Sequence, residues 1–425
     1  MTERFRWHPE ARLFDSTGAE VQAQPAASPI LPDTPQGLAA AIGLPAFRIG
    51  APDQPPPAPH EQPVVETLTS GSTGQPRRIR RTQGSWTASF SVNADFGIGP
   101  GARIASLGRL IHSLSLYGAV EGLHLGAHVH LLADLRPDRQ RAALQRQQIT
   151  HLYATPAQLR LILGPGLLPD LRLIFVGGSK LDSALRAALT TLAPSAQIRE
   201  FYGAAETSFI TLADETTPEA SVGRPYPGVQ ITLDPTGEVW VRSPYLFLGY
   251  AGTIAPPAFH LSPNIPAGGP SPEPVARSSR AEARQKACAS ALDSLPPTTR
   301  WRDGWLSVGE IGNLDNGFLT LRGRAGRMVT VADQNVFPEE IEGFLAALPG
   351  VTRAAVLPVP DAKRGHALIA VLQGDPSGEA AILAALRSEL GPLKSPKALI
   401  WREDWPMLPS GKTDLKALEA AIWPG

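Results

Sequence analysis

Short apolar runs alternate with helix-like stretches between residues 103 and 192, and this alternation constrains the fold more than any other feature of the sequence. The apolar runs lie at residues 103–107, 129–132, 149–153 and 171–176. The helix-like stretches lie at residues 110–123, 139–147, 156–163 and 183–192. Strands that alternate with helices pair in parallel, and the helices then cover the faces of the sheet. We therefore expect an α/β fold with parallel-rich sheets.

The rest of the 425-residue chain divides by composition, and its length predicts two or three domains. We expect residues 64–324 to form one large domain, in which the alternating pattern of residues 230–241 predicts antiparallel hairpins. Residues 252–300, rich in Pro, Ala, Ser and Gly, predict a loop insertion within it. Residues 1–63 are rich in Pro and Ala and predict a loosely packed lead-in.

Residues 325–425 have the pattern of a small α+β C-terminal domain. Pro338 followed by Glu339 and Glu340 predicts a helix start, because proline suits the first helical position and carboxylates suit the positive end of the helix dipole. Residues 379–390 predict a second helix, which Gly391 closes.

Composition excludes several classes of function. Lys and Arg total 39, as do Asp and Glu, so the zero net charge argues against a nucleic-acid-binding protein. Cys288 is the single cysteine, which excludes an internal disulfide and a cysteine zinc site. We expect no membrane span, because no apolar run is long enough, and no signal peptide, because residues 1–8 have no apolar segment. A cytoplasmic location is the expectation.

A loop rich in Ser and Gly gives the strongest local signal. It follows a predicted strand at residues 64–69 and comprises Thr69, Ser70, Gly71, Ser72, Thr73 and Gly74. Glycines let a backbone approach a phosphate closely, and hydroxyls add donors. Arg77 and Arg78 follow, with the charge to meet a phosphate. By itself the loop also fits an ordinary turn, and the arginine cluster at residues 77–81 by itself indicates a solvated face.

Two other nucleotide sites are not supported. Gly411, Lys412 and Thr413 resemble the end of a P-loop, but Pro406 stands where that loop requires its first glycine. No strand followed by a G-x-G-x-x-G turn and a helix is present, so a dinucleotide site of the Rossmann type is not indicated either.

The Ser/Gly loop is the first of several stretches that stand in a specific order. The others are FYGAAET at 201–207, GEVWVRSP at 237–244 with Gly249 and Tyr250, DGWLSVGE at 303–310, Gly323–Arg324, VFPEEIE at 336–342 and LPSGK at 408–412. Each is a weak signal alone, but together they resemble the adenylate-forming (AMP-binding) superfamily of acyl- and aryl-CoA synthetases, adenylation domains and luciferases. The resemblance covers roughly residues 64–425.

The resemblance implies two half-reactions in one site. A carboxylate attacks the α-phosphate of Mg-ATP to give acyl-AMP and pyrophosphate, and a thiol of coenzyme A or of a carrier protein's phosphopantetheine then displaces AMP. It also implies that residues 64–324 are the adenylation core and residues 325–425 a mobile C-terminal AMP-binding domain. Since the Ser/Gly loop lies so near the N-terminus, the first subdomain must be reduced.

The same resemblance assigns roles to individual residues. Residues 69–74 hold the β- and γ-phosphates. Glu206 helps to bind Mg²⁺ and Thr207 bonds the α-phosphate. Lys412 bridges the carboxylate and the phosphate, and with Glu206 and Thr207 it makes up the catalytic set.

The remaining nucleotide contacts come from two pairs of residues. Tyr202 and Gly203 border the adenine and the acyl group, while Glu310 and Arg324 bond the ribose. Alone, each of these residues fits a structural role, and only the ordered set singles them out.

The substrate side is less defined. His112 lies in a segment where acyl- and aryl-activating members often carry a histidine beside the substrate carboxylate. The alternative is a structural histidine on a helix face that forms a hydrogen bond with a neighbouring residue. Amino-acid-activating members usually have an aspartate there, and residues 110–115 contain none, so we expect a fatty, other acyl or aryl acid. Gly177 and Gly178 resemble a turn that lines the acyl pocket.

The sequence also departs from the family pattern. Gln75 and Arg77 replace the usual lysines of the Ser/Gly loop, and Glu310 replaces the usual aspartate. Gly326 stands at the hinge between the domains, where a polar residue is usual, and Asp333 stands where the pantetheine path usually has glycine.

These observations predict an ATP-dependent acid–thiol ligase, with coenzyme A and an acyl carrier protein as the two acceptors left open. A non-catalytic relative that binds a nucleotide or an acyl-adenylate is the alternative, which the departures motivate and the retained Glu206, Arg324 and Lys412 oppose. A third hypothesis is an enzyme that stops at the adenylate or uses a non-thiol acceptor.

Overall fold

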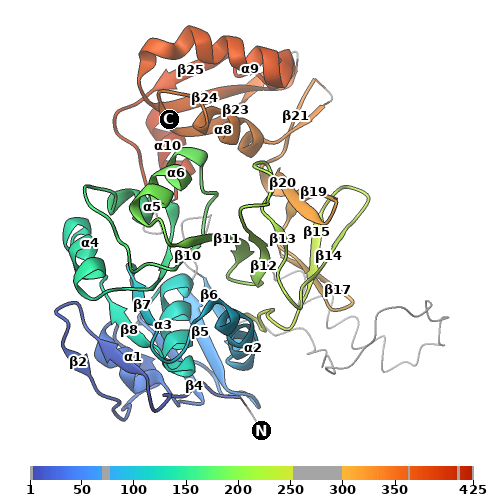
Figure 1. Cartoon of the computed structure of the whole chain (residues 1–425). Helices are drawn as coiled ribbons and strands as arrows, with labels where there is room; N and C mark the ends of the chain where they lie inside the picture. The colour runs from blue at the N-terminus through green and yellow to red at the C-terminus, as the bar shows by residue number, and fades with distance from the viewer. Residues whose placement is uncertain are drawn as a thin grey trace, which may run out of the picture.

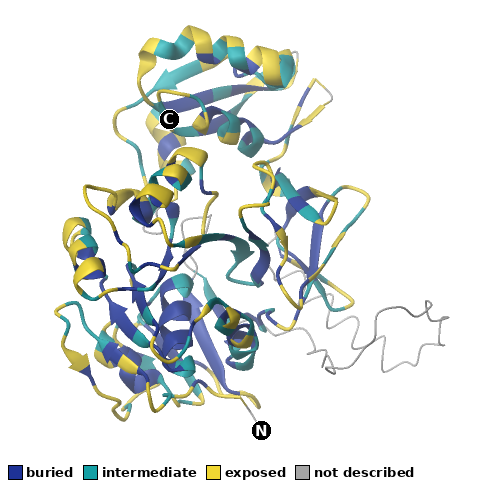
Figure 2. Cartoon of the chain, viewed as in Figure 1, coloured by how far each residue is buried: buried dark blue, intermediate teal, exposed yellow. Residues whose placement is uncertain are grey.

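A computed structural model describes residues 3–68, 77–251, 299–332, 334–361, 364–408 and 412–423. In Figure 1 the N-terminal strands and helices form a large body, and the segment after β20 forms a smaller body at the other end of the view. The strands of both bodies are mostly buried, whereas the outer faces of the helices are exposed (Figure 2).

The largest sheet has nine strands in the order β13-β12-β11-β10-β9-β7-β8-β1-β2. Its central strands are β8 (His128–Leu131), β7 (Arg103–Ser106), β9 (His151–Ala154), β10 (Leu173–Val176) and β11 (Gln197–Ala204). These strands pair in parallel, as predicted. At the edges, β12 (Ser208–Ala213), β13 (Arg224–Pro225) and β2 (Glu20–Val21) are antiparallel, so the sheet is mixed.

Helices bury both faces of this sheet. The helices are α2 (Gly84–Asn93), α3 (Ser113–Leu125), α4 (Pro137–Arg146), α5 (Pro156–Leu161) and α6 (Ser183–Leu192). On β10, Phe175 packs in the core that contains α3, and Ile174 packs in the core that contains α4, α5 and α6. Because both faces are covered, the strands read as continuous apolar runs instead of alternating ones.

The N-terminal segment is not a loosely packed lead-in, and that expectation was wrong. It contains β1 (Arg12–Phe14), β3 (Ile30–Leu31), α1 (Pro35–Ala41) and β4 (Ala46–Ile49) in addition to β2. β1 pairs with β8, and Leu13 and Phe47 are fully buried. Proline-rich composition misled the prediction, because short edge strands and a seven-residue helix give little periodicity to detect.

A second sheet has five strands in the order β16-β6-β5-β4-β3. Its further strands are β5 (Val64–Leu68), β6 (Arg78–Thr82) and β16 (Gly249–Tyr250). β6 contains most of the arginine cluster, so the interpretation as a solvated face was also wrong. Arg78 and Arg80 donate to the carbonyls of Pro55 and Pro59, and Arg81 is buried.

Residues 230–241 form antiparallel strands, as predicted. β14 (Gln230–Leu233) and β15 (Val239–Arg242) form the expected hairpin, which β17 (Arg300–Arg302) and β18 (Trp305–Ser307) extend to four strands. β19 (Glu310–Asp315) and β20 (Phe318–Arg324) form a separate hairpin. Of the insertion predicted at residues 252–300, all but residues 299 and 300 lies outside the described residues.

The C-terminal body is a small α+β unit. Its strands are β21 (Val329–Val331), β22 (Gln334–Val336), β23 (Val351–Asp361), β24 (Gly365–Gly374) and β25 (Ala398–Trp401). Its helices are α8 (Pro338–Ala346), α9 (Glu379–Lys394) and α10 (Leu415–Ile422). α8 and α9 begin where the sequence predicted, and α9 kinks at Gly391 before it ends. Among the helices described, none combines the length and the apolar character needed to cross a bilayer.

Candidate functional site

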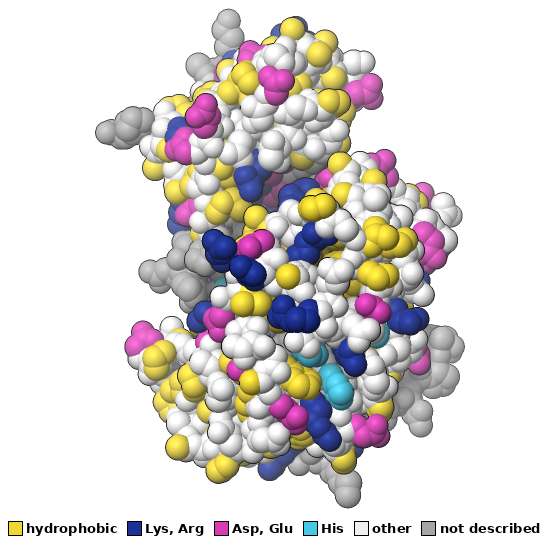
Figure 3. Space-filling view, turned by 60° about the vertical axis from the view of Figure 1, so that its left-hand side comes forward, with side chains coloured by type: hydrophobic (Ala, Val, Ile, Leu, Met, Phe, Trp, Pro, Cys, Tyr) yellow, Lys and Arg dark blue, Asp and Glu magenta, His cyan; other side chains and the backbone are white. Residues whose placement is uncertain are grey.

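A cavity of about 930 Å³ has walls from both bodies of the molecule. Its charged lining comes from β6, the β11–β12 turn, the β19–β20 hairpin and the segment before α10. These charged residues include Arg81, Glu206, Glu310, Arg324 and Lys412. Figure 3 shows Lys and Arg side chains on the face where the two bodies meet. The structure thus brings together residues that lie more than 300 positions apart in the sequence.

Glu310 and Arg324 face each other across the β19–β20 hairpin. Asn316 and Gly317 form its two-residue turn with positive φ angles of 50° and 79°, the conformation that Asn-Gly favours in tight hairpins. The turn pairs Asp315 with Phe318, and a shift in register between Ile311 and Gly312 then pairs Glu310 with Arg324. Nε of Arg324 donates to Oε1 of Glu310 at 2.9 Å. Burial opposes the charge of Arg324, but the Glu310 carboxylate raises the arginine's pKa overall.

Glu206 lies in the tight turn between β11 and β12. Its Oε1 accepts a hydrogen bond from the Tyr250 hydroxyl at 2.8 Å, and its backbone carbonyl accepts from the Phe247 amide. Thr207 is fully buried, and its Oγ1 accepts from the Ala204 amide at 3.0 Å. Glu206 is in the cavity wall, whereas Thr207 braces the turn behind it and is not among the described residues that line the cavity.

Arg81 also lines the cavity and was not predicted as a site residue. Its guanidinium donates to the carbonyls of Tyr245 and Ala205, so it ties β6 to the turn that carries Glu206. Burial lowers the pKa of Arg81 to about 10, while the Glu206 charge opposes that shift. The sequence contained a signal for this position, since Ile79 and Arg81 share the inward face of a strand on which Arg78 and Arg80 point the other way.

Lys412 enters the cavity from the small body. Its backbone carbonyl accepts from the Leu408 amide at 2.8 Å, which closes the loop that presents the side chain. Burial and the nearby Arg324 charge lower the pKa of Lys412, and Glu310 and Glu206 partly offset this effect. The residue as a whole is exposed to solvent, and its ammonium lies near the carboxylates of Glu310 and Glu206.

Tyr202 and Gly203 lie on β11 next to this charged group. The Tyr202 hydroxyl is buried and has no hydrogen-bond partner among the described residues. Burial, together with the Glu310 charge, raises its pKa well above the ordinary value. A Cβ at Gly203 would overlap the Ser208 carbonyl oxygen, so this position admits only glycine. Gly203 is in the cavity wall, whereas Tyr202 is not among the described residues that line the cavity.

His112 is the residue that caps the start of α3, and it lines the cavity. Asp33 fixes its segment, because the carboxylate accepts from the Leu110 amide and from Arg109 Nε at 2.9 Å each. Burial lowers the pKa of His112, with Asp33 opposing the shift and Arg109 adding to it. The imidazole is therefore held in its neutral form near neutral pH.

The two glycines predicted to line the acyl pocket differ in position, and one of them lines the cavity. Gly178, with a φ angle of 96°, is in the cavity wall, as is the following Ser179. Gly177 lies against the ring of Phe201, where a Cβ would overlap the aromatic carbons. Phe201 itself lines the cavity, so Gly177 shapes the wall indirectly.

The Ser/Gly loop, Thr69 to Gly74, lies outside the described residues, as does Asp333. On either side of residues 69–76, the β5–β6 register pairs Leu68 with Arg78. Leu68 and Arg77 both line the cavity. The phosphate-binding role of the loop stays a prediction.

Gly326 lies in a short 3₁₀ turn, Ala325–Arg327, that joins β20 to the small body. Arg327 pairs with Glu342 at 2.7 Å and with Glu339 at 3.3 Å, and both acids are on α8. These ion pairs hold Arg327 to the small body, so residues 324–326 connect the large body to the small one. The hinge role of Gly326 stays a prediction.

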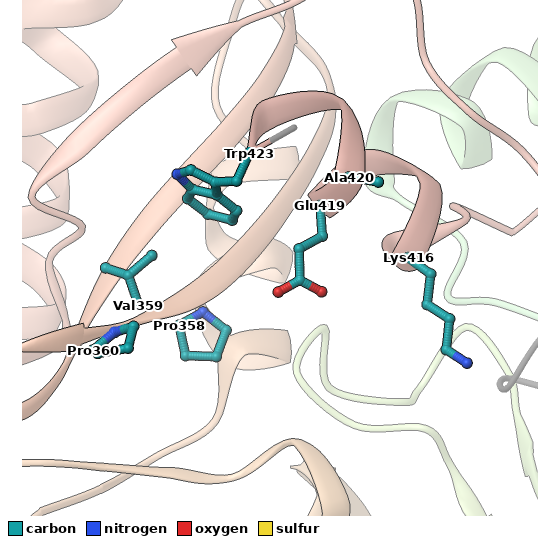
Figure 4. Close-up of a pocket in the computed structure, with 7 residues that line it drawn as sticks. All are labelled: Pro358, Val359, Pro360, Lys416, Glu419, Ala420 and Trp423. Atoms are coloured by element: carbon teal, nitrogen blue, oxygen red, sulfur yellow. The ribbon is translucent and has the colours of Figure 1, made fainter. Parts of the chain in front are cut away.

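A second hollow of about 550 Å³ lies on the small body, where Glu419 and Trp423 of α10 face Pro358 and Val359 of β23 (Figure 4). It is separate from the main cavity except at Lys416, which lines both. Among the described residues there is no group of three or more His, Cys, Asp and Glu side chains arranged to hold a metal ion.

Comparison with known proteins matches the chain to two family models. The model "AMP-binding enzyme" matches residues 9–251, and "AMP-binding enzyme C-terminal domain" matches residues 340–412. The first match begins at residue 9, whereas the sequence resemblance was limited to residues 64–425, so that limit was wrong. The N-terminal strands described above belong to the matched region.

Two curated relatives are similar over most of the chain. The uncharacterized acyl-CoA ligase YhfT of Bacillus subtilis is 29% identical over 85% of this chain and 69% of the relative. The 3-hydroxybenzoate-CoA ligase of an Aromatoleum species is 25% identical over 95% of this chain and 74% of the relative.

A solved structure supports the fold. o-Succinylbenzoate CoA synthetase (MenE) of Bacillus subtilis, in complex with its acyl-adenylate intermediate, superimposes with a TM-score of 0.65 at 22% identity. The likeness covers 84% of this chain and 68% of the synthetase.

Proposed function

The chain belongs to the family of AMP-binding enzymes, and from this premise we propose that it is an AMP-forming acid–thiol ligase. It activates a carboxylic acid other than an amino acid with Mg-ATP, releases pyrophosphate and holds the acyl-adenylate. It then transfers the acyl group to a thiol. The names of the two similar relatives, both CoA ligases, support this proposal.

One observation carries the proposal: cations from both bodies of the molecule converge on the same cavity. Arg81 and Arg324 come from the large body and Lys412 from the small one. Attack of a carboxylate on the α-phosphate brings two anions together, so the reaction requires preorganised positive charge at the meeting point. A module that only binds nucleotide does not require a lysine that the small body brings into the same cavity, which argues against the non-catalytic alternative.

Lys412 is the group that acts on the forming bond in this proposal. Burial and the neighbouring Arg324 charge lower its pKa, and its ammonium is the cation that the small body adds to the cavity for the developing negative charge. In this geometry the lysine is placed by the small body, and an open arrangement of the two bodies would remove it from the phosphate. Adenylate formation therefore depends on the position of the small body.

Other residues of the cavity bind the nucleotide in this proposal. The Glu310 carboxylate, fixed by Arg324, is an acceptor for the ribose hydroxyls. Tyr202 and Gly203 of β11 border the adenine, and Gly203 is the one of the two that lines the cavity. The Ser/Gly loop, anchored by Leu68 and Arg77, holds the β- and γ-phosphates.

Glu206 is the carboxylate in position to share the magnesium ion of the substrate Mg-ATP. Mg²⁺ at a nucleotide commonly has one or two protein carboxylates and completes its shell with phosphate oxygens and water, so a single glutamate in the wall fits. The ion supplies charge neutralisation on the phosphates. Tyr250 and Arg81 hold the glutamate and its turn in place.

The thiol acceptor is coenzyme A or the phosphopantetheine of an acyl carrier protein. The relatives named as CoA ligases favour coenzyme A. Asp333, which bears on the pantetheine path, lies outside the described residues, so the carrier protein stays the second acceptor to test.

The test is pyrophosphate release from purified protein and Mg-ATP with a panel of fatty and aromatic acids, each with and without coenzyme A. Acid-dependent release, followed by a thioester with coenzyme A, is the expected result. A thioester only with a phosphopantetheinylated carrier protein assigns that acceptor instead. ATP binding without release for every acid would contradict the proposed ligase and favour the non-catalytic alternative.

A further inference from the structure

Four aromatic side chains form one end of the cavity. They are Trp86 of α2, Tyr117 of α3, Phe209 of β12 and Phe201 of β11. Tyr117 packs edge-to-face against Trp86 and against Phe209, with ring centroids 5.2 Å apart in each pair, and Phe209 packs against Phe201 at 4.7 Å. We call this set the aromatic wall. It lies on the His112 side of the cavity, since His112 and Tyr117 both belong to the start of α3.

Buried hydrogen bonds hold the central ring of the aromatic wall in place. The Tyr117 hydroxyl is 2.7 Å from Ser89 Oγ, accepts from Asn93 at 3.1 Å and donates to Glu121 at 3.1 Å. Ser89, Asn93 and Glu121 are all fully buried. Rotation of Tyr117 away from the cavity would leave these polar groups without a partner in a site that excludes water.

A second layer keeps this network fixed. Glu121 also accepts from Asn93 at 2.8 Å and from the Tyr153 hydroxyl, and Tyr226 donates to Asn93 Oδ1 at 2.7 Å. Tyr153 packs so closely on Gly118 that a Cβ there would approach its ring to 2.6 Å. The aromatic wall is therefore a rigid end to the cavity, because buried and hydrogen-bonded polar side chains lie behind it.

Part of the cavity wall is open to solvent. Leu161 lines the cavity at the end of α5, and 63% of it is exposed. A long alkyl chain that turned away from the aromatic wall would pass this edge and leave methylene groups in water, which removes the benefit of burying them. Flat rings, by contrast, gain from edge-to-face contact with the rings already present.

Building on the proposed function, we propose that the aromatic wall restricts this ligase to short aromatic carboxylic acids and excludes long fatty acids. Tyr117 is the specificity-determining residue, and Glu121 is a positioning residue that acts through it. The carboxylate of the acid points to Lys412, and its ring lies against Tyr117 and Phe209.

The test uses two non-reactive adenylate mimics, benzoyl- and decanoyl-sulfamoyl adenosine, and measures their dissociation constants by calorimetry. We expect the benzoyl mimic to bind at least about tenfold more tightly, the size of effect that a hydrophobic pocket achieves for poorly fitting substrates. Equal or tighter binding of the decanoyl mimic would overturn the inference and leave the proposed function standing. Binding of neither mimic would overturn both.

Two variants at one position give the matched comparison. Tyr117→Ala opens the wall and should bring the dissociation constants of the two mimics together, whereas Tyr117→Phe keeps the ring and should preserve the benzoyl preference. Thermal unfolding of each variant shows whether it has folded. The wild-type comparison stands without either variant, and an unchanged preference in folded Tyr117→Ala would show that another residue sets the specificity.

Discussion

Nε of Arg324 donates to Oε1 of Glu310 at 2.9 Å, across a hairpin in which a register shift beside Ile311 places the two residues opposite each other. Arg324→Lys removes this planar donor and retains the charge. We expect ATP to bind about tenfold more weakly, which corresponds to the loss of about one charge-assisted hydrogen bond. Calorimetric titration with ATP measures the effect. Arg302→Lys, outside the cavity lining, is the matched control, and an equal loss there would contradict the assignment.

Arg81 fastens β6 to the turn that carries Glu206. Arg81→Lys leaves a charge but cannot reach the carbonyls of both Tyr245 and Ala205, so Glu206 should move. We expect the rate of adenylate formation to fall by about one to two orders of magnitude, as displacement of a positioned group does. Arg80→Lys alters the outward face of the same strand and should have little effect on the rate. Comparable losses in the two variants would indicate a general effect on β6.

Arg48 and Glu66 form a buried ion pair at 2.9 Å, in which neither side chain is more than 1% exposed. Arg48 also donates to the carbonyls of Ala51, Gln54 and Pro55, which holds the proline-rich segment against the sheet. Arg48→Met should reduce the free energy of unfolding by about 3 kcal/mol, because it removes the closer cation of a buried carboxylate and leaves only Arg78, at 3.5 Å, to pair with it. Urea denaturation measures this loss.

The exposed pair Arg12–Glu20 provides the comparison for that loss. Arg12→Met should cost under about 1 kcal/mol, since water screens an exposed pair. If both variants lose the same amount, the buried pair does not hold the segment.

Glu121 makes the stability of the fold depend on pH. Burial raises its pKa from 4.5 to about 7, so the fold favours the neutral carboxyl. This contribution is full below pH 4.5 and is lost as the pH rises through about 7. The shift corresponds to roughly 3 kcal/mol. Relative to Glu121→Gln, the wild-type free energy of unfolding should fall across this interval, as measured by urea denaturation at successive pH values. A constant difference would contradict the raised pKa.

The sequence predicted the central sheet well because both of its faces are buried. The apolar runs of β7 to β10 and the helices between them carry a periodic signal that needs no knowledge of distant contacts. A helix start was also readable where the residues gave a signal, as with Pro338, Glu339 and Glu340 at the start of α8.

The N-terminal segment and the arginine cluster were misread for one shared physical reason. Arg78 and Arg80 of β6 donate to carbonyls of the proline-rich segment, and each partner is unremarkable without the other. Such pairing joins residues about 20 positions apart through side chain and backbone, which neither periodicity nor composition reveals.

For the site, order along the chain identified Glu206, Glu310, Arg324 and Lys412, which the structure brings to one cavity. It missed Arg81 and the aromatic wall, because their positions depend on packing between α2, α3 and β12. Thr207 is the reverse case. The motif predicted that it bonds the α-phosphate, but in this structure its hydroxyl oxygen accepts from the Ala204 amide.

The most direct test of the account is isotope exchange of pyrophosphate into ATP, in the presence of an accepted acid, for the wild type and for Lys412→Ala. Exchange reports adenylate formation without the thiol step. We expect exchange in the wild type, its loss in Lys412→Ala with ATP binding retained, and its persistence in Lys397→Ala, which changes an exposed lysine of the same domain. Exchange by Lys412→Ala at the wild-type rate would contradict the role assigned to Lys412 and with it the proposed mechanism.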